Sequence, residues 1–339
     1  MNSASFGARE TGTDRPRISR NETTASLLIR CVESGRDVKC QGMVDIAWSS
    51  LADELVVAAD LFGSAGSALV ASWLEVETSR VSDDEFAAQF YRHLSLPGVL
   101  PSDYLHRVVC TRNGKLLGGI RFRNRDVNRP FVEIIAHGFD DLDRLRCCVR
   151  DEWSMFRPKH LRLCVTPGHT PGPNSVLDLS IYVARYKDML SPDPSVRLIP
   201  FPDPDHAIAM VRRRYEHMAK ADRAVARNVF PASPDDIRHW HYAGQLQTIT
   251  IHGSAVGALA VAPGAIRWIS GDEIQEEVIE ADHGGYGYAA LAQAAWASSK
   301  AVDPNQLLIG TIDGRNVASH KTATRARRRR VLDWIFIPV

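Results

Sequence analysis

Apolar and polar positions follow helical spacing in some segments and extended spacing in others, and one coarse order of elements occurs twice. Over residues 82–165 the pattern predicts a helix, a hairpin, a third strand, a helix and a strand. Asn113 and Gly114, between two apolar runs, mark the turn of the hairpin. Because residues 206–337 repeat this order, we predict a duplicated α+β unit.

The second half of the chain gives the most detailed predictions. Ser233 followed by Pro234 marks the start of a short helix, since proline suits the first turn. The expected helices cover residues 206–228, 231–240, 288–299 and 316–326. The expected strands cover residues 247–251, 255–261, 266–269, 274–279, 307–312 and 331–337.

The length of the chain and a proline-rich segment indicate more than one domain. The 339 residues exceed the roughly 250–300 at which single cores stop growing. A Ser-Pro-Asp-Pro segment containing Pro192 and Pro194 marks a boundary. We therefore expect a disordered leader over residues 1–24, an N-terminal domain over 25–192 and a C-terminal domain over 193–339.

Composition narrows the class of protein. The chain is 45% hydrophobic and 24% charged, which is typical of a soluble globular protein, and its net charge is only +1. That balance argues against a nucleic-acid partner. No signal peptide and no uninterrupted apolar run of membrane-spanning length is seen, so the predicted location is cytoplasmic, without a membrane partner. The six cysteines suit free thiols, and His239 and His241 lack a third ligand, so no metal site is expected.

Residues 276–291 form the segment most suggestive of chemistry. They run from an apolar strand through a turn containing Gly284, Gly285 and Gly287 into an alanine-rich helix. The first N–H groups of a helix have no partner within it, and glycine lets an anion approach them closely. The sequence has no GxGxxG in a parallel strand-helix-strand frame and no GxxxxGK[ST] motif, which disfavours both nucleotide-binding readings.

This segment resembles the signature loop of the GNAT N-acetyltransferase superfamily, Q/R-x-x-G-x-G/A between a strand and a helix. Gly285, Tyr286 and Gly287, followed by an alanine-rich helix, are similar to its second part. Downstream, residues 310–319 resemble the family's fifth strand and next helix, and residues 331–338 resemble its closing strand. The resemblance covers residues 199–339 in a consistent order.

The resemblance implies mostly antiparallel sheets with one splayed pair of parallel strands, flanked by helices. Acetyl-CoA or another acyl-CoA would lie where these strands part, and a carboxylate would act as the base, for which Glu273 or Glu277 is expected. The residues expected to bind the acyl-CoA are Val278, Ile279, Glu280, His283, Gly284, Gly285, Tyr286, Gly287, Tyr288, Asn316 and Ser319. Strand alternation predicts that Glu273 and Glu277 share one face and that Glu276 points to the other.

Two positions depart from the family pattern. The Q/R position holds Asp282 if both glycines are kept in register, or His283 if one residue is deleted, and both alignments stay open. The tyrosine that often acts as general acid falls near Ala323. His320 and Tyr286 are then the candidates for the acid.

The first half resembles the superfamily only in outline. Its fourth-strand equivalent leads into a helix through His137, Gly138, Phe139, Asp140 and Asp141, which offer one glycine and acidic or bulky neighbours. A phosphate site is not expected there. We interpret this half as a degenerate unit, an arrangement that resembles tandem members such as mycothiol synthase.

The predicted function is acyl transfer from acyl-CoA to a small-molecule or peptide amine by direct attack on the thioester. Two alternatives stay open: an aminoacyl-tRNA-dependent peptidyl transferase of the tandem type, and a non-catalytic CoA-binding module. Arg325 and the arginines at 327–330 reach the 3′-phosphate of CoA or an acidic substrate in one reading, and form a solvated turn in the other. A homodimer is also left open.

Overall fold

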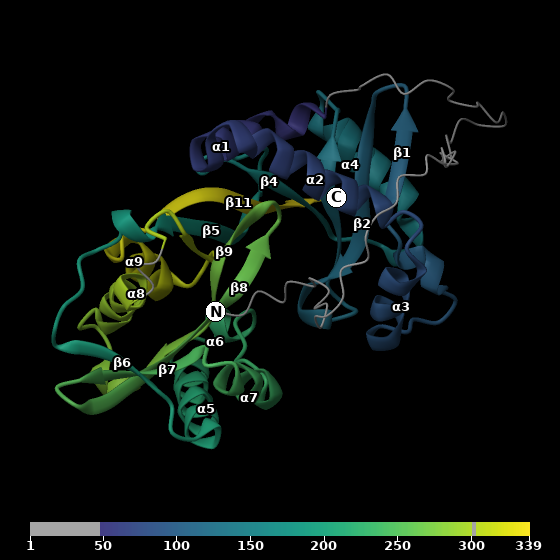
Figure 1. The fold of residues 1–339 in the computed structure, drawn as a ribbon. Helices are drawn as coiled ribbons and strands as arrows, with labels where there is room; N and C mark the ends of the chain where they lie inside the picture. Colours follow the sequence, from purple (N-terminus) through teal and green to yellow (C-terminus); the bar gives the residue numbers. More distant parts are fainter. Residues whose placement is uncertain (1–47, 300–302) are drawn as a thin grey trace, which may run out of the picture. The chain divides into compact units, whose positions relative to one another are not determined.

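The computed structural model describes residues 48–299 and 303–339, so the predicted leader over 1–24 lies outside the described residues. The chain divides into two compact units (Figure 1). Unit 1 holds Asp53–Glu75 and His160–Pro338, and unit 2 holds Val76–Lys159. The boundary expected after residue 192 therefore falls inside unit 1.

Unit 1 is built on a mixed sheet. In spatial order its strands are β4 (His160–Val165), β11 (Arg329–Pro338), β5 (Val176–Arg185), β10 (Leu307–Asp313), β9 (Ile269–Ile279), β8 (Ser254–Ile266), β7 (Leu246–Ile251) and β6 (Val196–Pro200). Neighbours pair antiparallel except β9 and β10, which are parallel. This confirms the predicted fold class, a mixed α+β sheet of GNAT type.

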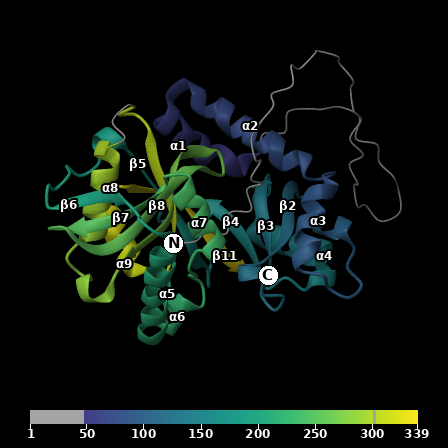
Figure 2. The same cartoon turned by 60° about the horizontal axis from the view of Figure 1, so that its bottom comes forward.

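Helices cover both faces of this sheet. They are α1 (Ala52–Phe62), α2 (Gly66–Ser79), α5 (Pro204–Ala221), α6 (Arg223–Ala226), α7 (Pro234–Tyr242), α8 (Tyr288–Ser299) and α9 (Val317–Arg325). Apolar residues of α8 pack with β8, β9 and β10 in one core cluster, whereas α5 and α7 pack against β8 and β9 in another. Figure 1 shows α8 beside α9, and Figure 2 shows α5 beside α6.

Most predicted elements of the second half are confirmed. Helix α8 has the predicted bounds, and α7 begins after Ser233, whose side chain accepts a bond from the Asp236 N–H as an N-cap. The predicted helix over 206–228 is instead two helices, because the Asp222 carboxylate starts α6 by accepting from two backbone N–H groups. Strand β5 is not among the predicted strands.

Helix α1 is joined to the β8–β9 turn by a buried ion pair. Two nitrogens of the Arg267 guanidinium donate to the carboxylate of Glu54, Nε at 3.0 Å and Nη2 at 2.7 Å, and the Trp268 indole N–H donates to the same carboxylate at 2.7 Å. The guanidinium also stacks 4.1 Å from the ring centroid of Trp73 on α2. Because Glu54 and Arg267 are both nearly inaccessible to solvent, each charge depends on the other.

The helical stretch Ser49–Ser79 is long and apolar enough to cross a membrane, judged by length and composition alone. Its most apolar window has a mean hydropathy of 1.6 and is 22% buried. A criterion of uninterrupted apolar runs misses this stretch because charged residues such as Glu54 and Asp60 interrupt it. The same stretch contains Glu54, whose buried carboxylate forms an ion pair with Arg267 inside the protein.

Unit 2 consists of an antiparallel meander with two main helices. Its strands, in spatial and chain order, are β1 (Arg107–Thr111), β2 (Gly114–Phe122) and β3 (Pro130–His137), and its helices are α3 (Asp84–His93) and α4 (Leu142–Glu152). The predicted hairpin and helices of the first half are thus confirmed. Aromatic residues fill the core, and Tyr104 packs on Phe90, Phe122 and Phe156.

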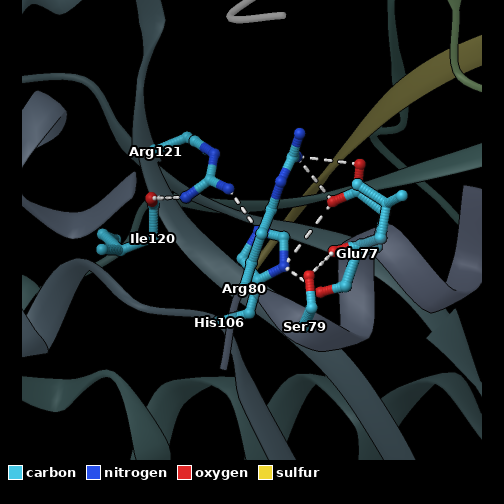
Figure 3. A network of polar contacts seen from close by, with 7 residues as sticks. Glu77, Ser79, Arg80, His106, Ile120 and Arg121 are labelled. Atoms are coloured by element: carbon cyan, nitrogen blue, oxygen red, sulfur yellow. Dashed lines mark hydrogen bonds and ion pairs between the residues drawn. The ribbon is translucent and has the colours of Figure 1, made fainter. Parts of the chain in front are cut away.

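A buried histidine links several polar groups of unit 2 (Figure 3). His106 is 1% exposed, and its Nδ1 lies 3.0 Å from the Glu77 carbonyl oxygen. A carbonyl only accepts, so Nδ1 carries the proton and the lone pair of Nε2 accepts from Arg121. The Glu77 carboxylate meanwhile accepts two bonds of 2.8 Å from Arg80. This arrangement requires a neutral imidazole, and burial, with Arg121 and Arg80 nearby, places the pKa of His106 well below its ordinary value.

We expect this histidine to make stability depend on pH. The unfolded chain binds a proton at His106 near pH 6.5, whereas the folded chain does not. The free energy of unfolding should therefore fall as pH drops below about 6.5, by up to about 1.4 kcal/mol per pH unit for this proton. Urea unfolding of wild type and His106→Gln between pH 5 and 8 measures the effect. Parallel pH dependences in the two proteins would contradict the assignment.

Candidate functional site

The glycine loop connects β9 to α8 at an exposed surface. After β9, a short turn over Ala281–His283 leads to Gly285 and Gly287, whose φ angles of +87° and +85° suit glycine. The first described backbone bond into α8 joins the Leu291 N–H to the Gly287 carbonyl at 3.2 Å. The N–H groups ahead of Leu291 therefore lack an intrahelical partner, as at any helix start.

An arginine lies beside this loop. A Cβ added at Gly287 would stand 2.3 Å from Nη1 of Arg325, so the guanidinium occupies the space that a side chain at this position would take. Arg325 is exposed, and no ion pair links it to another side chain within the described ranges. Free N–H groups and an exposed cation together suit a phosphate.

Strands β9 and β10 separate along the part of β9 that leads to this loop. Their parallel pairing consists of Leu308 with Asp272 and Ile309 with Glu273. Beyond these pairs, β9 continues to Ile279 paired with β8, and β10 continues to Asp313 paired with β5. One backbone edge of β9 thus faces a split about 17 Å long, at roughly 3.3 Å per residue.

A β-bulge in β9 decides which way three glutamates point. Opposite β8, Ala260 pairs with Glu276 and Val261 with Ile274, so Gln275 is one extra residue. The bulge reverses the alternation, and the prediction that Glu273 and Glu277 share a face is wrong. Glu273 and Glu276 lie on the face of α5 and α7, whereas Glu277 lies on the face of α8.

The Glu277 carboxylate is buried beside α8. Its Oε2 accepts from the Gln293 amide at 2.8 Å, while its Oε1 is shielded from solvent and has no hydrogen-bond partner within the described chain. Burial raises the pKa of Glu277 to about 7, and the positive charge of Arg328 opposes part of that rise. A carboxyl group with this pKa changes charge near neutral pH, as a general base must.

The other two glutamates differ from Glu277. Glu276 is 1% exposed and accepts from the Tyr215 hydroxyl at 3.0 Å and the Ala232 N–H at 2.9 Å, which ties β9 to the helices on that face. Burial, with the neighbouring Glu276 charge, raises the pKa of Tyr215 well above its ordinary value. Glu273 is buried against Gly264 of β8.

The arginine run at 325–330 is divided among several environments. Arg329 pairs with Asp60 of α1, and Arg330 contacts both carboxylate oxygens of Asp333. Arg327 is exposed, whereas Arg328 is buried, and its charge acts on Glu277. The alternative of one solvated turn therefore fails for Arg328, which is buried, while Arg325, Arg327 and Arg329 are exposed.

A tyrosine from β5 lies beside Ala323, near which the resemblance places the family tyrosine. Ala323 is fully buried and packs with Tyr182 and Ile312. The Nε2 atom of His320 lies 3.1 Å from the Asp313 carbonyl and must donate, so Nδ1 accepts from the Tyr182 hydroxyl at 2.9 Å. Burial raises the pKa of Tyr182 and lowers that of His320, so both are neutral at pH 7.

Sequence reasoning did not find Tyr182, Gln293 or Arg328. The arginine run was a signal for Arg328, but nothing local distinguishes the buried arginine from its neighbours. Nothing at all in the local sequence places Tyr182 beside Ala323, because strand pairing does so.

The remaining predicted residues occupy the loop and the helix ends. Val278 is buried against α5 and α7, and Glu280 accepts an exposed contact from Arg213. His283 is half-buried in the turn, and the exposed Tyr286 ring stacks on Tyr288 at 5.5 Å between centroids.

Asn316 and Ser319 form the N-cap of α9. The Asn316 side chain accepts from the Ser319 N–H at 3.1 Å. The predicted contacts of both residues with a cofactor stay predictions.

The corresponding helix of unit 2 lacks an open N-terminus. The Asp141 carboxylate accepts from the N–H groups of Asp143 and Arg144 at the start of α4. A bound anion would compete with this carboxylate and be repelled by it. The contact agrees with the expectation that the first half has no phosphate site.

Unit 1 has a concavity whose lining is separate from these groups. It measures about 560 Å³ and is bordered by residues of 192–199 and by Ala295, Ser298 and Ser299 near the end of α8. None of the predicted site residues lines it. Over residues 48–299 and 303–339, no three His, Cys, Asp or Glu side chains gather as a metal-binding group.

Unit 1 therefore combines a mixed sheet that has one parted parallel pair with a glycine loop and a following helix, the arrangement that the resemblance to the GNAT superfamily implies. No protein-family model matches the sequence, and no curated protein is significantly similar to it.

Solved structures similar to this chain include two GCN5-related N-acetyltransferases and a tandem GNAT protein. A GCN5-related N-acetyltransferase from Sphaerobacter thermophilus is 12% identical, covers 71% of this chain and 82% of its own, and has a TM-score of 0.43. A GCN5-related N-acetyltransferase from Kribbella flavida is 14% identical, covers 76% of this chain and 95% of its own, and has a TM-score of 0.39. A tandem GNAT protein from the clavulanic acid biosynthesis pathway is 14% identical, covers 75% of this chain and 95% of its own, and has a TM-score of 0.35.

Proposed function

We propose that unit 1 binds an acyl-CoA and transfers the acyl group to an amine. The observation that carries this proposal is the parting of β9 from β10 directly ahead of the glycine loop and α8. A long ligand with a phosphate at one end matches this arrangement, because the loop offers N–H groups and the split offers an unpaired strand edge.

The residues present fit such a ligand. The N–H groups around Gly285 and Gly287 and the Arg325 guanidinium would hold the pyrophosphate, and the backbone of β9 near Val278 and Glu280 would pair with the extended arm. When bound, acyl-CoA supplies an activated acyl group as a thioester. The chain itself would orient that group and exclude water from it.

Glu277 would take the proton that the acceptor amine gives up. It lies on the strand that borders the split, its Oε1 has no partner within the described residues, and its pKa of about 7 suits proton transfer at neutral pH. Glu273, the second predicted candidate, lies on the opposite face of the sheet.

A glycine substitution tests the proposed phosphate site. Gly285→Glu should weaken acetyl-CoA binding at least 100-fold in isothermal titration, because it puts a carboxylate among the N–H groups. Gly253→Glu is a matched control: Gly253 has the same φ of +87°, lies in the β7–β8 turn, and likewise has open space where a Cβ would stand. Equal affinity in wild type and Gly285→Glu would show that the phosphate is held elsewhere.

Turnover is tested separately from binding. Wild-type protein with acetyl-CoA and a panel of amines should release free thiol in proportion to acylated amine. If acetyl-CoA binds but no amine in the panel promotes thiol release, the site is a CoA-binding module. If acetyl-CoA does not bind at high micromolar concentration, the proposal is rejected.

A further inference from the structure

The guanidinium of Arg328 is a buried positive charge with unused hydrogen-bonding capacity. Arg328 lies in the turn between α9 and β11 and is only 2% exposed. Its Nε, Nη1 and Nη2 atoms have no hydrogen-bond partner within the described part of the chain. A guanidinium taken out of water without a paired anion is costly, so it is expected at such a position only with a partner.

The position of Arg328 in the sheet is specific. A Cβ added at Gly310 would stand 3.0 Å from Nη1 of Arg328 and 3.7 Å from the Cβ of Ile274. Gly310 on β10 and Ile274 on β9 are the first residues beyond the last paired positions of the two strands. The guanidinium therefore lies at the closed end of the split, where a side chain at position 310 would obstruct it.

Charge around Arg328 is only partly balanced. Glu277 is the acidic neighbour whose charge acts on it, yet Oε1 of Glu277 and the guanidinium make no hydrogen bond to each other. With a pKa of about 7, Glu277 is partly protonated at neutral pH, whereas burial lowers the pKa of Arg328 only to about 10. The arginine thus stays charged when the glutamate is neutral.

A ligand bound as proposed above would reach this charge with its far end. Its phosphate would lie at Gly285 and Gly287, where the split is open, and its arm would follow the free edge of β9. The end of the arm would then stand near Ile274 and Gly310. This is the end that carries the sulfur and the acyl group.

We propose that Arg328 is the receptor for a negative charge at the acyl end of the ligand in unit 1. The inference rests on the proposed function. Two groups supply the same chemistry: the thiolate of CoA, or a carboxylate at the end of the acyl chain. In either case the guanidinium donates charge-assisted hydrogen bonds, which are the strong ones in a buried site.

Isothermal titration of the full chain with four ligands shows whether the negative charge is the CoA thiolate or a carboxylate of the acyl chain. CoA against desulfo-CoA, which lacks the thiol, reports on the thiolate, and succinyl-CoA against acetyl-CoA reports on the carboxylate. A charge-assisted bond predicts at least tenfold tighter binding of CoA or of succinyl-CoA within its pair. Bound thiolate should also appear in the ultraviolet absorbance of CoA at a lower pH than for free CoA.

Variants assign the preference to the residue. Arg328→Met should abolish the preferred ligand's advantage and leave the affinity for its neutral counterpart within about twofold, whereas Arg328→Lys should retain part of it. Arg327→Met is the matched control, because Arg327 is an exposed arginine of the same turn. Thermal unfolding of each variant verifies that it is folded.

The outcomes distinguish the two hypotheses. If all four ligands bind wild type with equal affinity, the role of Arg328 is rejected while CoA binding stands, and this result needs no variant. If Arg328→Met still binds the charged ligand more tightly than its neutral counterpart, the role of Arg328 is also rejected. If none of the four binds, the proposed function fails and the inference fails with it.

Discussion

Replacing Glu277 by glutamine is expected to lower kcat of acyl transfer by about 10²–10⁴-fold while acetyl-CoA binding changes little. Glutamine has the same size and keeps an oxygen for the Gln293 amide, but it cannot take a proton. Initial rates of thiol release at saturating acetyl-CoA, with an amine that wild type acylates, measure the effect.

The pH profile gives the same test a second readout. Because burial raises the pKa of Glu277 to about 7, the carboxyl is protonated below that pH and cannot act as base. The wild-type kcat should therefore rise with pH through about 7, and this limb should be missing in Glu277→Gln. Glu273→Gln is the control, since Glu273 lies on the other face of β9. A large loss in Glu273→Gln with little change in Glu277→Gln would assign the base to Glu273.

Replacing Glu54 by alanine should destabilise the protein by about 3–5 kcal/mol, because it leaves the Arg267 guanidinium buried without its anion. The change also removes the acceptor of the Trp268 indole N–H. Urea unfolding monitored by circular dichroism measures the free energy of unfolding. Asp60→Ala is the matched control on the same helix, and its exposed pair with Arg329 predicts a loss of at most about 1 kcal/mol.

A loss below about 1 kcal/mol in Glu54→Ala would show that the ion pair does not anchor α1. A double variant, Glu54→Ala with Arg267→Met, should recover part of the stability, because it removes the unpaired charge as well. Failure to recover would attribute the loss to packing of the carboxylate against Trp268 rather than to charge.

Local signals in the sequence account for most of the second half. Alanine-rich spacing after Gly287 gave the bounds of α8, and Ser233 with Pro234 gave the start of α7. These signals act within a few residues, through caps, turns and periodicity, so they can be read without knowing the fold.

Local signals in the sequence could not predict which strands pair with β5. Strand β5 comes from the predicted N-terminal domain over 25–192 but pairs with β10 and β11. Which strand completes a sheet depends on contacts between distant residues, and the proline boundary at 192 does not report them. The same pairing brings Tyr182 beside Ala323.

The sequence by itself determined the glycine loop and the helix that follows it, because each depends on short-range backbone preferences. Only the tertiary structure decided which glutamate faces α8 and which arginine is buried. One extra residue, Gln275, reverses the face of every later side chain on β9, and the turn after α9 buries Arg328 among exposed arginines. Neither outcome leaves a local mark, since strand register and burial are set by the partner strands.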